Sequence, residues 1–86
     1  MKRILASALG LLAFTGSAQA GPDCSDMTHD VAMWEVLKSF EEVGGTVKLA
    51  KVTSGNCYEI YGIVDGQKFE IYYNPITGEE IERNKG

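Results

Sequence analysis

The residues best suited to acid–base chemistry lie in one short stretch. His29 is the only histidine of the chain, and Asp26 and Asp30 lie near it. A histidine beside carboxylates can act as a general base, but catalysis also needs a nucleophile or a second carboxylate held against it. The sequence offers no such set, and acidic residues are expected in a first helical turn for electrostatic reasons alone. We therefore predict a solvated helix start here, and no enzyme.

The sequence also lacks the residue patterns that are typical of metal and cofactor sites. A tight transition-metal site needs three or four ligands, which one histidine with scattered carboxylates does not supply. The acidic groups at Glu41–Glu42 and at residues 79–82 lack the spacing of a calcium-binding loop. The glycines follow no phosphate-loop pattern. We expect neither a metal nor a cofactor.

The first twenty residues have the pattern of an export signal. A positive start at Met1–Arg3 precedes the apolar run Ile4–Phe14, and Ala18–Ala20 is a small-residue cleavage site. The run is shorter than the roughly 20 residues that span a bilayer. We expect cleavage after Ala20, which leaves residues 21–86 as a single domain that is periplasmic or secreted and makes no membrane contact.

The remaining chain is acidic and small. All 12 acidic residues follow residue 20, whereas two of the 8 basic residues precede it, so the mature part has a formal net charge of −6. Nucleic-acid binding needs a basic footprint, so this charge argues against it. Sixty-six residues are enough for one small hydrophobic core.

Two cysteines, Cys24 and Cys57, are the only ones in the chain. An even number of cysteines in a small exported protein is typical of disulfide bonding, and their separation fits no C-x-x-C redox motif. A loop of this length stabilises a fold by roughly 3 to 4 kcal/mol in the chain-entropy model. We predict one structural disulfide, Cys24–Cys57.

The pattern predicts an α+β fold, with one helix packed on a three- to four-stranded antiparallel meander. Apolar residues recur at helical spacing within 28–43, where Ser25 or Thr28 can cap the start and Gly44–Gly45 ends the helix. Extended runs follow at 46–53, 57–64 and 67–74. Residues 79–82 form either a short last strand or a tail. The apolar stripe of the helix consists of Met33, Val36, Leu37, Phe40 and Val43.

Turn chemistry predicts the strand register. Asp65–Gly66 favours a two-residue hairpin, which places Gly62 opposite Phe69, whose ring would cover the gap that the glycine leaves. The first hairpin loop, either 54–55 or 53–56, places Val47 opposite Gly62 and Leu49 opposite Ile60. The face away from the helix is then expected to be wet. Its members are Lys48, Ala50, Val52, Glu59, Tyr61, Ile63, Lys68, Glu70 and Tyr72.

The position of Cys57 is awkward in this arrangement. Strict alternation places it on the wet face, away from the helix whose leading segment carries Cys24. Either the strand begins irregularly at Asn56–Cys57, or the segment with Cys24 passes around the sheet edge.

Five residues are candidate partner contacts. Trp34 lies off the helical stripe, so it either packs under the segment held by Cys24 or anchors a partner. Tyr61 and Tyr72 are diagonal on the wet face between Glu59 and Glu70, where they either stabilise the sheet as a cross-strand pair or bind a partner. Aromatic anchors surrounded by acidic groups favour a protein surface with basic groups.

The order of these elements resembles the PepSY domain, in particular its small exported, cysteine-bearing members. The resemblance covers roughly residues 31–81 and rests on the helix stop, the strand 57–64, Asp65–Gly66, the aromatic strand 69–73 and the closing segment 74–79. One departure is Asn74, where Asp is more usual.

The resemblance implies a role in restraining peptidases. PepSY units occur in the propeptides of thermolysin-type metallopeptidases, where they are associated with inhibition, and also as isolated exported domains. We therefore expect a non-enzymatic binding module that inhibits or modulates an exported peptidase or another envelope protein. The alternative is a small periplasmic protein that responds to a ligand or a cation. The sequence does not determine the oligomeric state.

Overall fold

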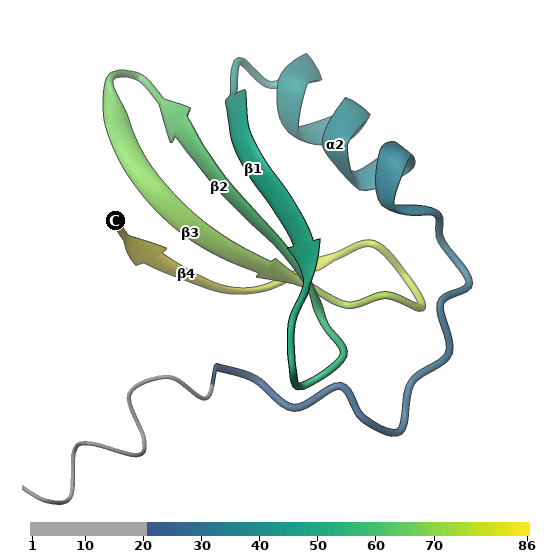
Figure 1. Ribbon diagram of the computed structural model, residues 1–86. Coiled ribbons are helices and arrows are strands. Elements are labelled where there is room, and N and C mark those ends of the chain that lie inside the picture. Colours follow the sequence, from purple (N-terminus) through teal and green to yellow (C-terminus); the bar gives the residue numbers. More distant parts are fainter. Residues whose placement is uncertain (1–20) are drawn as a thin grey trace, which may run out of the picture.

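The computed structural model describes residues 21–86, so the expected export signal lies outside the described residues. These residues form one helix and one four-stranded antiparallel sheet with strand order β1-β2-β3-β4 (Figure 1). The sequence thus correctly predicted a single helix followed by antiparallel strands, with four strands as the outcome. The elements are α2 (Met33–Glu42), β1 (Thr46–Val52), β2 (Tyr58–Val64), β3 (Gln67–Tyr73) and β4 (Glu80–Lys85).

The helix begins later than expected. Ala32 is still extended, and its backbone N–H donates to the Glu35 carboxylate at 3.3 Å, so neither Ser25 nor Thr28 caps the helix. Thr28 instead donates its hydroxyl to Asp30 in the preceding segment. The expected helix stop is confirmed, because Gly44 and Gly45 donate their N–H groups to the carbonyls of residues 41 and 40.

The β2–β3 hairpin has the expected register. Asp65 and Gly66 both have positive φ, 52° and 79°, as a type I′ turn requires. Pairing runs from Val64 opposite Gln67 to Tyr58 opposite Tyr73 without interruption. Local turn chemistry therefore predicted this part of the sheet correctly.

The β1–β2 pairing differs from the prediction over most of its length. Asn56 has φ 72° and Thr53 pairs with Cys57, so the loop has three residues rather than two or four. Leu49 consequently lies opposite Tyr61 and not Ile60, and a bulge beyond it restores the expected pair of Val47 with Gly62.

The shift moves side chains of β1 to the other face. A displacement by one residue reverses the direction of every side chain until the bulge at Lys48 corrects it. Ala50 and Val52 therefore share the helix-facing side with Ile60 and Tyr58, whereas we had placed them on the wet face. Leu49 is 51% exposed instead of lying in the core.

The core lies between α2 and the sheet. Val36 and Phe40 of the helix belong to the same buried cluster as four residues of β2 and β3. A Cβ on Gly62 would lie 2.7 Å from the Phe40 ring, so Phe40, and not Phe69 as predicted, fills the space over this glycine. The sheet members of the cluster are Tyr58, Ile60, Ile71 and Tyr73.

The last strand continues further than the sequence suggested. The Asn74 side-chain oxygen accepts the N–H groups of residues 76 and 77, and the turn reverses the chain after β3. Strand β4 then pairs with β3 from Glu80 to Lys85, so the segment is a strand and not a tail.

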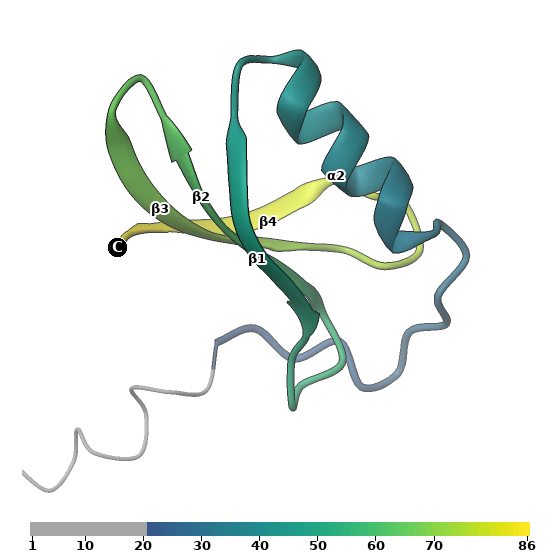
Figure 2. The ribbon, with the colours of Figure 1, turned by 45° about the horizontal axis from the view of Figure 1, so that its top comes forward.

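The segment 21–31, which we call the leading segment, passes around the end of the sheet. Figures 1 and 2 show it running beside the β1–β2 loop on its way to α2. The Cys24–Cys57 disulfide fastens it there, as predicted, and the Cys24 N–H donates to the Gly55 carbonyl at 2.7 Å. Both explanations for Cys57 hold in part: Asn56 has φ 72° and β2 begins only at Tyr58, so the strand start is irregular, and the leading segment also passes beside the β1–β2 loop.

Candidate functional site

The outer face of the sheet, which α2 does not cover, carries four of the five candidate contacts. Glu59 lies directly opposite Tyr72, and Tyr61 lies directly opposite Glu70. Alternation along β2 and β3 sends all four side chains to the same face. We call Glu59, Tyr61, Glu70 and Tyr72 the carboxyl–tyrosine cluster.

Two members of the cluster are buried. Glu59 is only 2% exposed and Tyr72 is 8% exposed, while Tyr61 and Glu70 are half-buried. The leading segment contributes to this cover, because a Cβ on Gly21 would lie 3.0 Å from the Tyr72 ring. The expected wet face is therefore wet only in part, and Glu59 and Tyr72 present little surface to a partner.

The environment of Glu59 opposes its ionisation. Loss of hydration on burial raises the pKa of the Glu59 carboxyl, and the neighbouring Glu70 carboxyl raises it further. The Lys51 ammonium, whose Nζ lies 3.8 Å from Oε1 of Glu59, acts in the opposite direction and is the weaker influence. Within residues 21–86, Oε2 of Glu59 has no hydrogen-bond partner.

The two tyrosines of the cluster stay protonated at high pH. The Glu70 carboxylate, as a hydrogen-bond acceptor, raises the pKa of Tyr61 to about 12. Burial, followed by the charges of Glu59 and Glu70, raises the pKa of Tyr72 to about 12. The phenols are therefore poor candidates for proton transfer near neutral pH.

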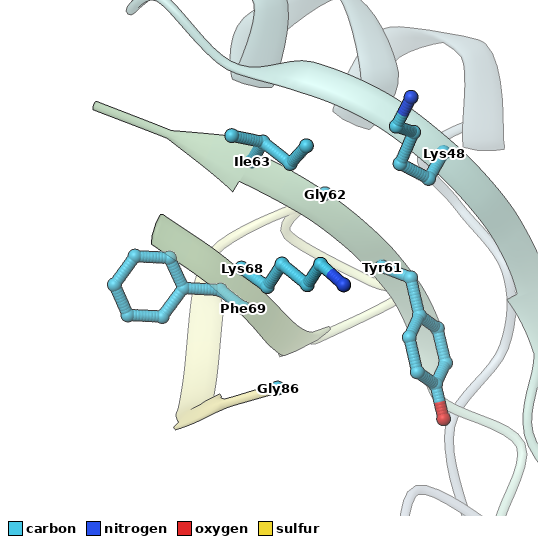
Figure 3. A pocket seen from close by; sticks show the side chains of 7 residues that line it. All are labelled: Lys48, Tyr61, Gly62, Ile63, Lys68, Phe69 and Gly86. Atoms are coloured by element: carbon cyan, nitrogen blue, oxygen red, sulfur yellow. The ribbon is translucent and has the colours of Figure 1, made fainter. Parts of the chain in front are cut away.

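A hollow of about 400 Å³ lies on the outer face beyond the cluster, toward the β2–β3 turn. Figure 3 shows the side chains around it: Lys48 comes from β1, Tyr61 and Ile63 from β2, and Lys68 from β3. Both lysines are exposed, and Ile63 is half-buried. The hollow is therefore lined mainly by apolar groups, and two exposed lysines lie at its border.

Trp34 and His29 lie away from this face. Trp34 on α2 is 63% exposed, so it does not pack under the leading segment, and it remains a candidate contact on a second surface. His29 precedes the helix instead of starting it. Its ring meets the Tyr58 ring edge-on at 5.0 Å between centroids, and its Nε2 lies 2.9 Å from the Asn56 side-chain oxygen.

Asn56 is an important residue that the sequence analysis missed. Its side-chain amide donates to the carbonyls of Cys24 and Met27, both at 3.0 Å, and its oxygen faces His29. The sequence feature that could have identified it is an asparagine at the end of a short hairpin loop, because asparagine tolerates positive φ. Its three contacts hold the leading segment against the loop.

Within residues 21–86, no group of three or more His, Cys, Asp or Glu side chains is arranged to hold a metal ion. In the same part of the chain, no helix has the length and apolar character needed to cross a membrane.

The chain matches the model of a known family. The model of the family described as peptidase propeptide and YPEB domain matches residues 4–84, nearly the whole chain. The chain belongs to the PepSY family. No curated protein and no solved structure matches this PepSY chain. Membership suggests a module of the propeptide and peptidase-inhibitor kind and is consistent with a protein outside the cytoplasm, as the resemblance implied.

Proposed function

We propose that this protein is a non-catalytic, exported PepSY module that binds a peptidase, or another protein of the cell envelope, and restrains it by covering part of its surface. The family match supports the class of function. The observation that carries the choice of surface is the hollow on the outer face, which lies on the side of the sheet that α2 leaves open.

The geometry favours the face of the sheet over its β1 edge. Strand β1 carries the bulge at Lys48, which interrupts the regular ladder that an added strand would need. The hollow, in contrast, offers an apolar floor at Ile63 and an aromatic wall at Tyr61. Such a pocket suits one apolar side chain of a partner.

The charges around the hollow determine the partner chemistry. The sequence led us to expect a basic partner, because Glu59 and Glu70 were assumed to be accessible. Glu59 is buried, whereas Lys48 and Lys68 are exposed at the rim. We therefore propose a partner segment in which carboxylates flank an apolar residue.

Inhibition of an exported peptidase tests the proposal. The oxidised protein is used to capture peptidases from its own exported fraction, and the activity of each captured enzyme is measured against increasing amounts of the protein. We expect dose-dependent loss of activity. Lys68→Glu should raise the inhibitory concentration about tenfold, because it places a like charge against the partner's carboxylates.

The matched control is Lys38→Glu, which makes the same charge change at an exposed position of α2. It should leave inhibition unchanged. Equal effects of the two variants would reject the hollow as the contact surface. Failure to inhibit any captured peptidase would reject the peptidase as the partner. Trp34→Ala, tested in parallel, shows whether the helix surface contributes.

A further inference from the structure

Glu59 is the buried group whose interactions are least complete. Its Oε2 atom has no hydrogen-bond partner among the described residues, and the residue is only 2% exposed. Its Oε1 atom has one cationic neighbour, Lys51, at the long distance of 3.8 Å. A buried carboxylate oxygen without a partner is costly, so something should satisfy it in the working protein.

The groups that face Glu59 leave the cluster short of positive charge. Among the described residues, Lys51 on β1 is the cation that acts on Glu59, whereas Lys48 and Lys68 lie farther along the same face, at the hollow beside Tyr61. Glu82 of β4 adds to the acidic side, because it lies opposite Tyr72. The titratable groups in and around the carboxyl–tyrosine cluster are Lys51, Glu59, Tyr61, Glu70, Tyr72 and Glu82.

Gly21 lies close to this cluster. A Cβ on Gly21 would be 3.0 Å from Cε2 and 3.3 Å from the hydroxyl oxygen of Tyr72, so the Gly21 backbone rests on the phenol end of that ring. Tyr72 is in turn the direct cross-strand neighbour of Glu59. Three residues further on, Cys24 is fastened by its disulfide and by a backbone hydrogen bond to Gly55, which holds Gly21 near the cluster.

The Ala20–Gly21 bond is also the one at which the sequence predicts cleavage. We propose that removal of the export signal supplies the missing cation, because the new α-ammonium group of Gly21 pairs with the carboxylates of Glu59 and Glu70. A signal peptidase adds water across the Ala20–Gly21 bond. Ala20 leaves with a carboxylate, and Gly21 keeps an amine that takes up a proton.

Through this pairing, the final fold depends on removal of the export signal. Before cleavage, position 21 has only a neutral amide N–H to offer. After cleavage, an ammonium group with three donors lies beside a carboxyl pair that has an unpartnered oxygen. The leading segment is then fastened to the outer face at Gly21 and to the loop at Cys24. The inference is independent of which protein the module binds.

Titration of the Gly21 amine tests the proposal without any partner. The full chain is expressed and exported so that the cell removes the signal, and mass spectrometry establishes the first residue. Carbon-13 labelled glycine then reports the pH dependence of the Gly21 α-carbon. We expect a midpoint at least about one unit above the usual α-amino pKa of about 7.7 to 8.0, because nearby carboxylates favour the charged form.

Two variants localise the effect. Glu59→Gln should return the Gly21 midpoint to the usual range, whereas Glu79→Gln, the same change at an exposed position, should leave it raised. In case Glu59→Gln does not fold, acetylation of the wild-type Gly21 amine gives a second readout, and we expect it to lower Tm at neutral pH.

Several results would overturn the inference. A mature chain that begins at a residue other than Gly21 would remove its basis. An ordinary midpoint in the wild type would show that the amine does not meet the carboxyl pair. Equal midpoints in Glu59→Gln and Glu79→Gln would show that Glu59 is not the partner.

Discussion

The two faces of the sheet are stabilised by different means, although the same strands build both. Toward α2, residues such as Ile60 and Ile71 are completely buried and pack against Phe40. On the outer face, the alternate residues of the same strands include Glu59 and Tyr72, which are nearly as buried but polar. In the part of the chain that the structure describes, no helix covers the outer face (Figure 1).

The difference shows how a small domain can bury a second surface without a second hydrophobic core. Burial of apolar area is non-directional and tolerates approximate packing. Burial of carboxyl and phenol groups demands specific partners, and the cross-strand neighbours supply them only in part, because Oε2 of Glu59 has no hydrogen-bond partner among the described residues. The helix-facing side should therefore govern stability, and the outer face should govern recognition and the response to pH.

Truncation of Phe40 should have the largest effect. Phe40→Ala removes the ring that fills the space over Gly62 and Gly45, and the cavity should lower the free energy of unfolding by about 3 to 5 kcal/mol. Urea denaturation measures the change. Leu49→Ala, at a position that is 51% exposed, serves as the control and should cost far less. Similar losses would contradict the assignment of the core to the helix-facing side.

Removal of the disulfide should come next. Replacing both Cys24 and Cys57 with serine should lower the free energy of unfolding by about 3 to 4 kcal/mol, since the crosslink restricts the unfolded chain.

Hydrogen exchange of the backbone amides would sharpen the comparison between the two faces of the sheet. We expect protection to fall first in the leading segment and at Tyr72, while β2 and β3 amides near Ile60 stay protected until global unfolding.

High pH should destabilise the outer face. The folded-state pKa values of Tyr61 and Tyr72 are raised to about 12 from 10.0, so their contribution is complete below pH 10 and is lost as pH rises toward 12. Absorbance titration of phenolate formation checks this. Glu70→Gln should lower the midpoint of Tyr61, because it removes the charged acceptor. An unchanged midpoint would contradict the cross-strand interaction.

Replacement of Trp34 should have the smallest effect on the fold. Because this side chain is 63% exposed, Trp34→Ala should change the free energy of unfolding by no more than about 0.5 kcal/mol. Thermal and urea denaturation measure it. A loss of several kcal/mol would show that Trp34 packs against the domain after all, as the first of our two sequence interpretations held.

The two hairpins show how far sequence reasoning reaches. In the β2–β3 hairpin, Asp65 and Gly66 specify the turn type and thereby the whole register. In the β1–β2 hairpin, an apparently similar argument placed Leu49 in the core. A three-residue loop ending at Asn56 and a bulge at Lys48 make two compensating shifts, and neither leaves a clear pattern in the sequence.

The candidate site shows the same division. Alternation along β2 and β3 correctly grouped Glu59, Tyr61, Glu70 and Tyr72 on one face. Their exposure could not be predicted in this way, because it depends on tertiary contacts, such as the approach of the leading segment to Tyr72. The path of that segment follows from Asn56, the disulfide and the close approach of Gly21 to Tyr72.

The sequence by itself determined the fold class, the helix stop, the type I′ hairpin and the disulfide pairing, because each depends on a few neighbouring residues or on a single pair of cysteines. Only the tertiary structure decided which residues of β1 face the core, that Phe40 covers Gly62, that Glu59 is buried, and that the leading segment approaches Tyr72. These outcomes depend on contacts between residues far apart in the chain, whose geometry is set by packing and not by local conformational preference.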